Sequence, residues 1–199
     1  MNKTNVLILD TGCANLGSVR CAFEKMGVQA KVSHLAEDIR RADKLIFPGV
    51  GTTEAAMRAL TERGLIDLLA VATQPVLGIC LGMQLLTKRS EEGAVDCLGL
   101  IATECKKLVT SADIRVPHMG WNETFFDASH PLFNNIKNGE YFYYVHSYAV
   151  PVGDFTIATC EHGAAFSAAI ARDNFMGVQF HPERSSAAGA QLLKNFVNL

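Results

Sequence analysis

The chain has 199 residues, 49% of them hydrophobic, and a formal net charge of −2. This length supports one substantial core, so we expect a single domain over residues 1–199, and the charge balance excludes a basic face for nucleic acid. A chain this large and apolar does not need its six cysteines as disulfides, and its first residues form no secretory signal. Free thiols in a reducing cytoplasm are therefore expected.

The first half of the chain alternates short apolar runs with amphipathic stretches. The apolar runs occupy residues 6–9, 31–33, 44–47 and 75–79, and helical patterns occupy residues 15–26 and 53–60. Continuous apolar strands separated by helices are typical of a parallel sheet that is covered on both faces. The pattern predicts an α/β fold with a central, mostly parallel sheet flanked by helices.

Residues 68–87 carry no formal charge over 20 residues, which is the length of a membrane helix. Pro75 divides this run, because it lacks a backbone donor and biases Gln74 toward extended geometry. Gly78 and Gly82 follow it. The stretch therefore predicts the end of one helix, a buried strand and the start of another helix, and a membrane span is not expected.

The second half is richer in β-branched and aromatic residues. Strand patterns occupy residues 141–145, 155–158 and 175–180, and a helix is expected over about 187–197, where Leu192, Leu193, Phe196 and Val197 share one face. No internal repeat, low-complexity segment or linker marks a second domain.

The sharpest local signal is Gly78-Ile79-Cys80-Leu81-Gly82, where a strand pattern runs into a helical one. This is the thiol version of a nucleophile elbow, in which small residues two positions either side of Cys80 allow a tight turn. A cysteine at a helix N-terminus is also favoured as the thiolate. The alternative interpretation is a buried, inert cysteine in a βα turn.

A thiolate nucleophile needs a base, and the base must be oriented by a third group. Residues 177–180 form a strand pattern that delivers His181 to a strand end, and Pro182 stops that strand so that Glu183 can fold back onto the imidazole. A lone histidine is more often structural, but none of the other five has a comparable setting.

Acyl transfer also requires N–H donors for the developing oxyanion. The N–H of Leu81, directly after Cys80, is one candidate. The glycine-rich loop at residues 48–52, with Val50 and Gly51, follows a strand pattern and can supply the other. Such a loop can instead bind phosphate, but it lacks the spacing and lysine of a P-loop.

These motifs, in this order, resemble the triad-type glutamine amidotransferases over residues 46–185. The resemblance implies the flavodoxin-like fold of that family, a Cys80–His181–Glu183 triad that hydrolyses glutamine through a thioester, and no metal or cofactor. It also implies an oxyanion strand at residues 49–51. The residues that it implies for substrate binding are Gln84 and Glu92 at the α-amino end and Ser147 and Tyr148 at the α-carboxylate.

Three further stretches, at residues 10–16, 117–122 and 143–148, resemble the histidine-biosynthesis branch, the glutaminase subunits of imidazole glycerol phosphate synthase. Together with residues 181–185 they extend the resemblance over nearly the whole chain. Two positions depart from the pattern: many members have Tyr where Thr11 stands and Lys where Arg184 stands. Arginine and lysine differ in geometry, so a gating role of position 184 does not transfer.

In that branch the partner is a (β/α)₈-barrel synthase, or cyclase, that consumes the ammonia, and the resemblance implies a heterodimer with a buried path between the two subunits. Trp121, the only tryptophan, lies in a turn-like segment before Asn122. We expect these two residues at the partner interface, since large amphipathic rings often anchor interfaces. The alternative is a tryptophan at the edge of the domain's own core.

Other functions use the same fold. A glutaminase of the anthranilate or pyridoxal-phosphate type would carry the same triad with a different partner. A thiol protease, chaperone or redox sensor would need neither the histidine and glutamate about a hundred residues after Cys80 nor the glutamine at the fourth position after it. A catalytically inactive binding module is disfavoured because all three triad residue types are present.

Overall fold

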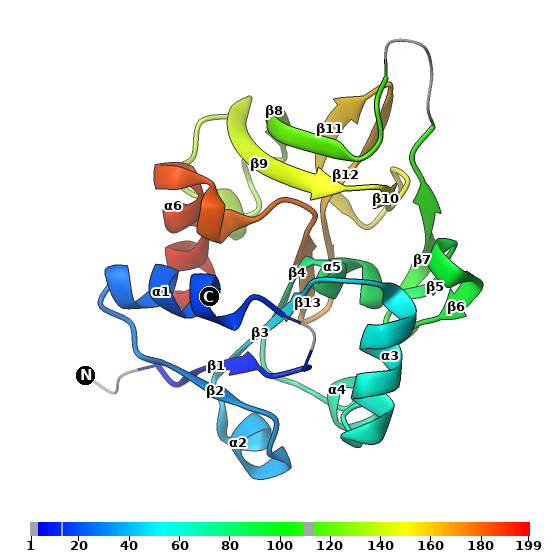
Figure 1. Ribbon diagram of the computed structural model, residues 1–199. Helices are drawn as coiled ribbons and strands as arrows, with labels where there is room; N and C mark the ends of the chain where they lie inside the picture. The colour runs from blue at the N-terminus through cyan, green and yellow to red at the C-terminus, as the bar shows by residue number, and fades with distance from the viewer. Residues whose placement is uncertain (1–3, 13, 110–113) are drawn as a thin grey trace.

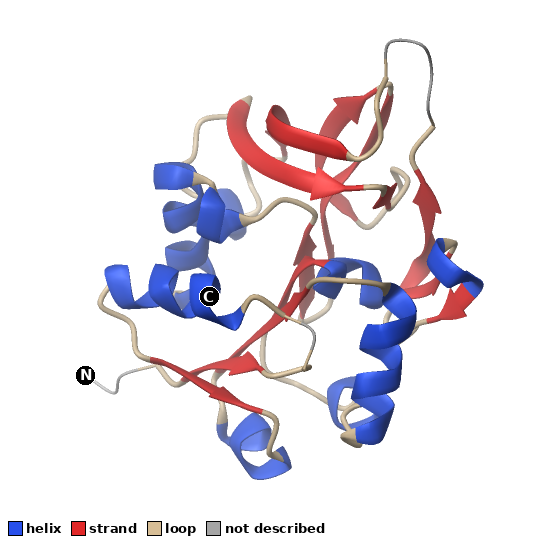
Figure 2. Ribbon diagram, viewed as in Figure 1, coloured by secondary structure: helices blue, strands red, loops and turns tan. Residues whose placement is uncertain are grey.

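The computed structural model describes residues 4–12, 14–109 and 114–199. Its centre is a nine-stranded mixed sheet (Figures 1 and 2). In spatial order the strands are β2 (Ala30–Ser33), β1 (Val6–Leu9), β3 (Lys44–Gly49), β4 (Val76–Cys80), β13 (Phe175–Val178), β12 (Ala164–Arg172), β11 (Thr156–His162), β8 (His118–Phe126) and β9 (Glu140–His146). The first five run parallel, and the remaining pairs are antiparallel.

Helices cover both faces of the parallel part. They are α1 (Leu16–Lys25), α2 (Ala36–Arg41), α3 (Thr53–Glu62), α4 (Ile66–Ala70), α5 (Leu81–Leu85) and α6 (Ser186–Val197). Strand β1 illustrates why both faces need cover, because its alternate residues, all apolar, point to opposite faces of the sheet. Val6 and Ile8 pack with α1 and α6, whereas Leu7 and Leu9 pack with α2, α3 and α4. The α/β class expected from the sequence is confirmed.

A smaller four-stranded sheet lies beside the main one. It consists of β10 (Tyr148–Ala149), β7 (Ile101–Lys107), β5 (Thr87–Ser90) and β6 (Val95–Asp96). Three short 3₁₀ helices complete the described residues: η1 (Glu92–Ala94), η2 (Pro131–Phe133) and η3 (Pro182–Arg184). The small sheet was not predicted, because β5, β6 and β10 have only two to four residues and the longer β7 is largely polar.

The uncharged run at residues 68–87 divides as expected into the end of α4, the buried strand β4 and helix α5. Among the described residues, no helix has both the length and the apolar character of a membrane span.

One local expectation was wrong. Trp121 does not lie in a turn; it lies in the middle of strand β8, opposite Tyr143 of β9. The neighbouring Gly120 suggested a turn, but long-range pairing with β9 decides the conformation here.

Candidate active site

Cys80 lies in a strained turn at the junction of β4 and α5. Its backbone has φ 54° and ψ −109°, a sparsely populated region for a residue with a side chain. Gly82 makes the turn possible, because a Cβ there would collide with the carbonyl oxygen of Phe47. At Gly78 a Cβ would lie 2.7 Å from the backbone of Gly82. The elbow geometry predicted from the glycine spacing is present.

His181 lies beside this turn because β13 pairs in parallel with β4, with Val178 opposite Ile79. The imidazole Nδ1 lies 2.8 Å from Oε1 of Glu183, and the two side chains are only 8% and 3% exposed. Glu183 comes from η3, the turn that Pro182 begins. The carboxylate thus fixes the orientation of the imidazole, as expected from the sequence.

The charge state of His181 follows from its neighbours. Burial alone would lower the pKa of its imidazole, but the Cys80 sulfur and the Glu183 carboxylate both favour the cation and raise this pKa to about 10. Cys80 and Glu183 therefore both favour the charged form of His181 near neutral pH.

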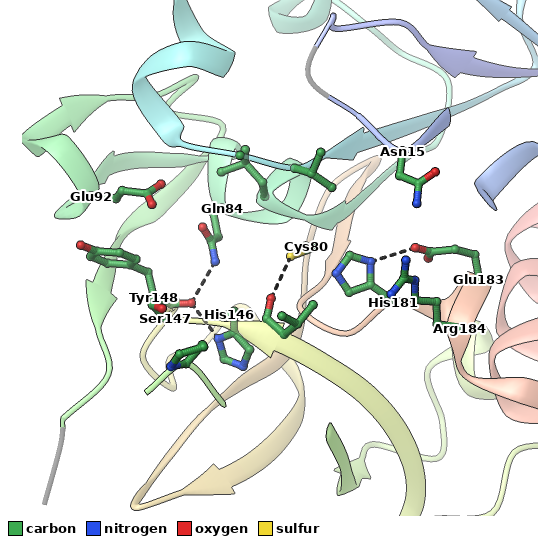
Figure 3. Close-up of a pocket in the computed structure, with 15 residues that line it drawn as sticks. Asn15, Cys80, Gln84, Glu92, His146, Ser147, Tyr148, His181, Glu183 and Arg184 are labelled. Atoms are coloured by element: carbon green, nitrogen blue, oxygen red, sulfur yellow. Dashed lines mark hydrogen bonds and ion pairs between the residues drawn. The ribbon is translucent and has the colours of Figure 1, made fainter. Parts of the chain in front are cut away.

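A cavity of about 360 Å³ opens at this point (Figure 3). It brings together every catalytic, oxyanion and substrate-binding residue expected from the sequence. These are Cys80, His181, Glu183, Val50, Gly51, Leu81, Gln84, Glu92, Ser147 and Tyr148. The parallel half of the main sheet carries the thiol, and the segment after β9 forms the facing wall (Figure 3). Gly51 has φ +93°, a backbone conformation that suits glycine.

Two polar residues that line the cavity, Gln84 and Glu92, are held by hydrogen bonds. The side-chain Nε2 of Gln84 donates to the carbonyl oxygen of Tyr148 at 2.9 Å and to Oε1 of Gln179 at 2.9 Å. Glu92 accepts from the backbone N and the hydroxyl of Thr53, at 2.7 and 2.8 Å. This carboxylate is thereby fixed at the N-terminus of α3, facing the cavity.

Sequence reasoning missed several residues here. Gln179 is fully buried, and its Nε2 lies 3.7 Å from the Cys80 sulfur. Asn15, the N-cap of α1, lines the cavity and lies above Glu183 in Figure 3. His146 and Arg184 also line it. A glutamine inside the otherwise apolar strand pattern at residues 175–180 was a signal that could have been used.

Trp121 and Asn122, expected at the partner interface, do not line the cavity. Trp121 is 51% exposed on the outer face of β8. The Asn122 side chain lies on the opposite face, where its Nδ2 donates to the carbonyl oxygen of Glu161 at 2.8 Å and lies 3.2 Å from Nε2 of His118. The expectation that both residues lie at the partner interface stays a prediction.

The chain matches a known family of proteins over nearly its whole length. The family model of the class-I glutamine amidotransferases matches residues 7–199. Among solved structures, PurLQS from Thermotoga maritima superposes with a TM-score of 0.75 at 16% identity, covering 98% of each chain. A glutamine amidotransferase from the same organism gives a TM-score of 0.65 at 14% identity, covering 100% of this chain and 84% of the other. The chain belongs to the class-I glutamine amidotransferase family.

Two curated relatives show to which branch of this family the chain belongs. The imidazole glycerol phosphate synthase subunit HisH of Salmonella typhimurium is 58% identical over 196 residues, which is 98% of this chain and 100% of the relative. The HisH subunit of Escherichia coli K12 is 56% identical with the same coverage. Within the family, the chain belongs among the HisH subunits.

Proposed function

We propose that residues 1–199 form a single amidotransferase domain that hydrolyses glutamine at Cys80, His181 and Glu183 and passes the ammonia to a (β/α)₈-barrel synthase subunit. The chain is the glutaminase subunit of imidazole glycerol phosphate synthase and acts in histidine biosynthesis. The observation that carries the catalytic assignment is the Cys80 elbow beside a buried His181–Glu183 pair 2.8 Å apart.

The first chemical step forms a thioester. The Cys80 thiolate attacks the carboxamide carbon of glutamine, and the carbonyl oxygen becomes an oxyanion. Backbone N–H groups of Leu81 and of the Val50–Gly51 loop stabilise it, and each well-placed donor contributes roughly 3 kcal/mol. As the tetrahedral intermediate collapses, the C–N bond breaks and the His181 imidazolium gives its proton to the leaving nitrogen, which departs as ammonia.

The second step regenerates the enzyme. Neutral His181 removes a proton from water, and the resulting hydroxide attacks the thioester carbon. The C–S bond breaks, glutamate leaves, and the thiolate again faces an imidazolium. Glu183 keeps Nδ1 of His181 occupied throughout, so Nε2 is the nitrogen that exchanges protons with substrate.

Substrate recognition is assigned to the opposite end of the cavity. The α-ammonium of glutamine would meet the Glu92 carboxylate and the side-chain oxygen of Gln84. The α-carboxylate would be received by the backbone of Ser147 and Tyr148. This arrangement places the carboxamide at Cys80 and gives selectivity for an amino acid over a simple amide.

The partner surface is assigned to an exposed apolar face on β8 and β9. Met119, Trp121 and Phe125 alternate along β8 and are 64%, 51% and 52% exposed, and Tyr141 of β9 is 48% exposed. The exposed Glu123 lies on the same face, opposite Tyr141. A group of large exposed apolar side chains on one strand face is typical of interaction sites. We assign Trp121 as its anchor, in a heterodimer with the barrel subunit.

The complex would work in the cytoplasm, where thiols stay reduced. The described cysteines, Cys21, Cys80, Cys97, Cys105 and Cys160, are free. An anthranilate-type or pyridoxal-phosphate-type role is less well supported, given the identity to HisH subunits over nearly the full chain.

The assignment can be tested with Cys80→Ala in the complex with the barrel subunit. Glutamine-dependent turnover should be lost, because no other nucleophile lies at the elbow, while synthase activity with added ammonium should persist. Cys21→Ala, which changes an exposed cysteine, is the matched control and should behave as wild type. Glutamate release by purified Cys80→Ala protein would refute the assignment.

A further inference from the structure

Two buried histidines outside the triad connect strand β8 to the cavity wall. His118 and His146 are 4% and 6% exposed. They are paired directly across β8 and β9, and Nδ1 of His118 lies 2.9 Å from Nε2 of His146. His146 also lines the cavity, so this pair forms the layer behind the segment that faces Cys80.

The direction of the hydrogen bonds can be derived from the Tyr148 carbonyl, which only accepts. Nδ1 of His146 lies 2.8 Å from that oxygen and must therefore carry a proton. Burial lowers the pKa of His146 to about 3, so the ring is neutral and its Nε2 is an acceptor. The proton between the two rings then belongs to Nδ1 of His118.

The same reasoning extends to Asn122. Burial, with a smaller repulsion from His162, lowers the pKa of His118 to about 4, so its Nε2 is also an acceptor. The Asn122 amide donates to it at 3.2 Å. The amide orientation is fixed independently, since Nδ2 also donates to Glu161 O and Oδ1 accepts from the backbone N of Glu123 at 2.8 Å. Reversing any one bond would place two donors or two acceptors face to face.

The chain of donors continues toward the nucleophile. The Tyr148 carbonyl oxygen accepts one hydrogen bond from Nδ1 of His146 and another from Nε2 of Gln84. Gln84 also donates to Gln179, whose amide lies 3.7 Å from the Cys80 sulfur. The Tyr148 carbonyl is thus the junction at which the antiparallel half of the sheet is tied to the elbow.

We propose that His118 and His146 are positioning residues that hold the Ser147–Tyr148 segment, through the Tyr148 carbonyl, in the conformation that receives glutamine. This inference rests on the proposed glutaminase function. Neither imidazole exchanges protons with substrate. Their effect is on substrate binding, because the segment they hold is assigned to the α-carboxylate and supplies no group that reacts with the carboxamide.

Two substitutions at His118 separate positioning from packing. His118→Phe keeps a ring that can stack on Tyr144 and His162, whose centroids lie 4.9 and 4.2 Å away, but it removes the donor to His146. His118→Asn keeps an N–H near the position of Nδ1 but loses the ring. In the complex with the barrel subunit, His118→Phe should raise KM for glutamine roughly three- to tenfold, which corresponds to the free energy of one hydrogen bond, and should change kcat less.

The two variants are expected to rank in opposite order by their loss of substrate affinity and by their loss of thermal stability. KM should be higher for His118→Phe than for His118→Asn, whereas the melting temperature should be lower for His118→Asn, which leaves a cavity. A purely structural role would make Asn the worse variant in both measurements and would overturn the inference. His162→Phe is the matched control: His162 stacks on His118, but its Nε2 bonds to Arg115 O outside the chain of donors, so KM should not change.

A spectroscopic test does not depend on turnover. In the ¹⁵N-labelled full-length protein near neutral pH, His118 and His146 should both be neutral with the proton on Nδ1. A proton on Nε2 of either ring, or equal KM values in wild type and His118→Phe, would overturn the inference alone. Failure of the proposed function looks different: Cys80→Ala would retain glutaminase activity while both histidines keep Nδ1–H.

Discussion

The parallel and antiparallel halves of the main sheet contribute different parts of the site. The inner strands of the parallel half, β1, β3, β4 and β13, are buried on both faces, and β4 and β13 supply the Cys80 elbow and the approach to His181. In the antiparallel half, strand β8 has one buried and one exposed face and supplies the apolar face around Trp121, and the Ser147–Tyr148 wall follows directly after β9. The strained backbone of Cys80 can persist because packed residues surround it. Binding of glutamine and of the partner requires side chains that are exposed.

This comparison indicates that changes in the parallel half should act on kcat, and changes in the antiparallel half on KM and on partner binding. The two halves meet at β13 and β12 in the sheet and at the Tyr148 carbonyl in the site. Substitutions in each half can therefore show whether the two halves have separate roles.

The largest effect is expected at His181. His181→Ala should lower kcat by roughly 10⁴, the upper end for general acid–base catalysis. Glu183→Gln should leave a higher residual rate, because an imidazole without its carboxylate loses orientation and stabilisation of its charge but remains a base. Steady-state kinetics of glutamate release measure both. A larger loss in Glu183→Gln than in His181→Ala would contradict the assigned roles.

The next effect is the dependence of turnover on the partner. Free hydrolysis wastes glutamine, so we expect the isolated chain to be a poor glutaminase and the barrel subunit with its nucleotide ligand to raise kcat by roughly 10²–10³, the value of one oxyanion donor. The partner must bind the active arrangement more tightly for this to occur. Equal kcat values for chain alone, with partner, and with partner plus ligand would refute such gating.

Gly51 offers a test of where this gating lies. Proline cannot adopt the φ of +93° that Gly51 has, and it also lacks the N–H that can stabilise the oxyanion. Gly51→Pro should therefore lower the partner-stimulated kcat far more than the basal kcat. An equal loss in both states would place the gating elsewhere.

A smaller effect is expected on the exposed face of the antiparallel half. Trp121→Ala should weaken the complex by roughly thirtyfold in Kd, as for an interface anchor, and lose stimulation at low partner concentration only. Val71→Ala is the matched control, since Val71 is also an exposed apolar residue (73%) but follows α4, far from β8 in Figure 1. Unchanged partner affinity in Trp121→Ala, measured by titration calorimetry, would contradict the interface assignment.

The parallel half could be predicted well from the sequence because its strands are continuous apolar runs between helical patterns. Residues 44–47 and 75–79 were expected as strands, and β3 and β4 occupy these positions. The antiparallel half was predicted less completely. Strand β8 has one exposed face and contains Gly120, so its sequence resembles a loop, and only pairing with β9 and β11 defines it.

The site shows the same difference. Cys80, His181 and Glu183 belong to short motifs whose chemistry is local, so their spacing in the sequence was informative. Gln179 and the pair of His118 and His146 act through contacts between residues 28 or more positions apart. No pattern along the chain predicts that Nδ1 of one histidine meets Nε2 of another.

The charge on His181 depends on Cys80, and a spectroscopic measurement can detect this dependence. Burial lowers the pKa of this imidazole, and Cys80 and Glu183 together outweigh burial and raise the pKa to about 10. A raised pKa means that the ring is charged below about 10 and becomes neutral above it. Cys80→Ala removes one of the two groups that favour the cation and leaves the burial in place, so the pKa should fall.

A ¹⁵N titration of the imidazole in wild type and Cys80→Ala measures this difference directly. Cys21→Ala, which changes an exposed cysteine, should leave the titration of His181 unchanged. If His181 were already neutral in the wild type near neutral pH, the ring would have to gain a proton before it could protonate the leaving nitrogen. A charged ring is poised to donate at once, and the nitrogen then departs as neutral ammonia, the nucleophilic form that a synthase partner can use.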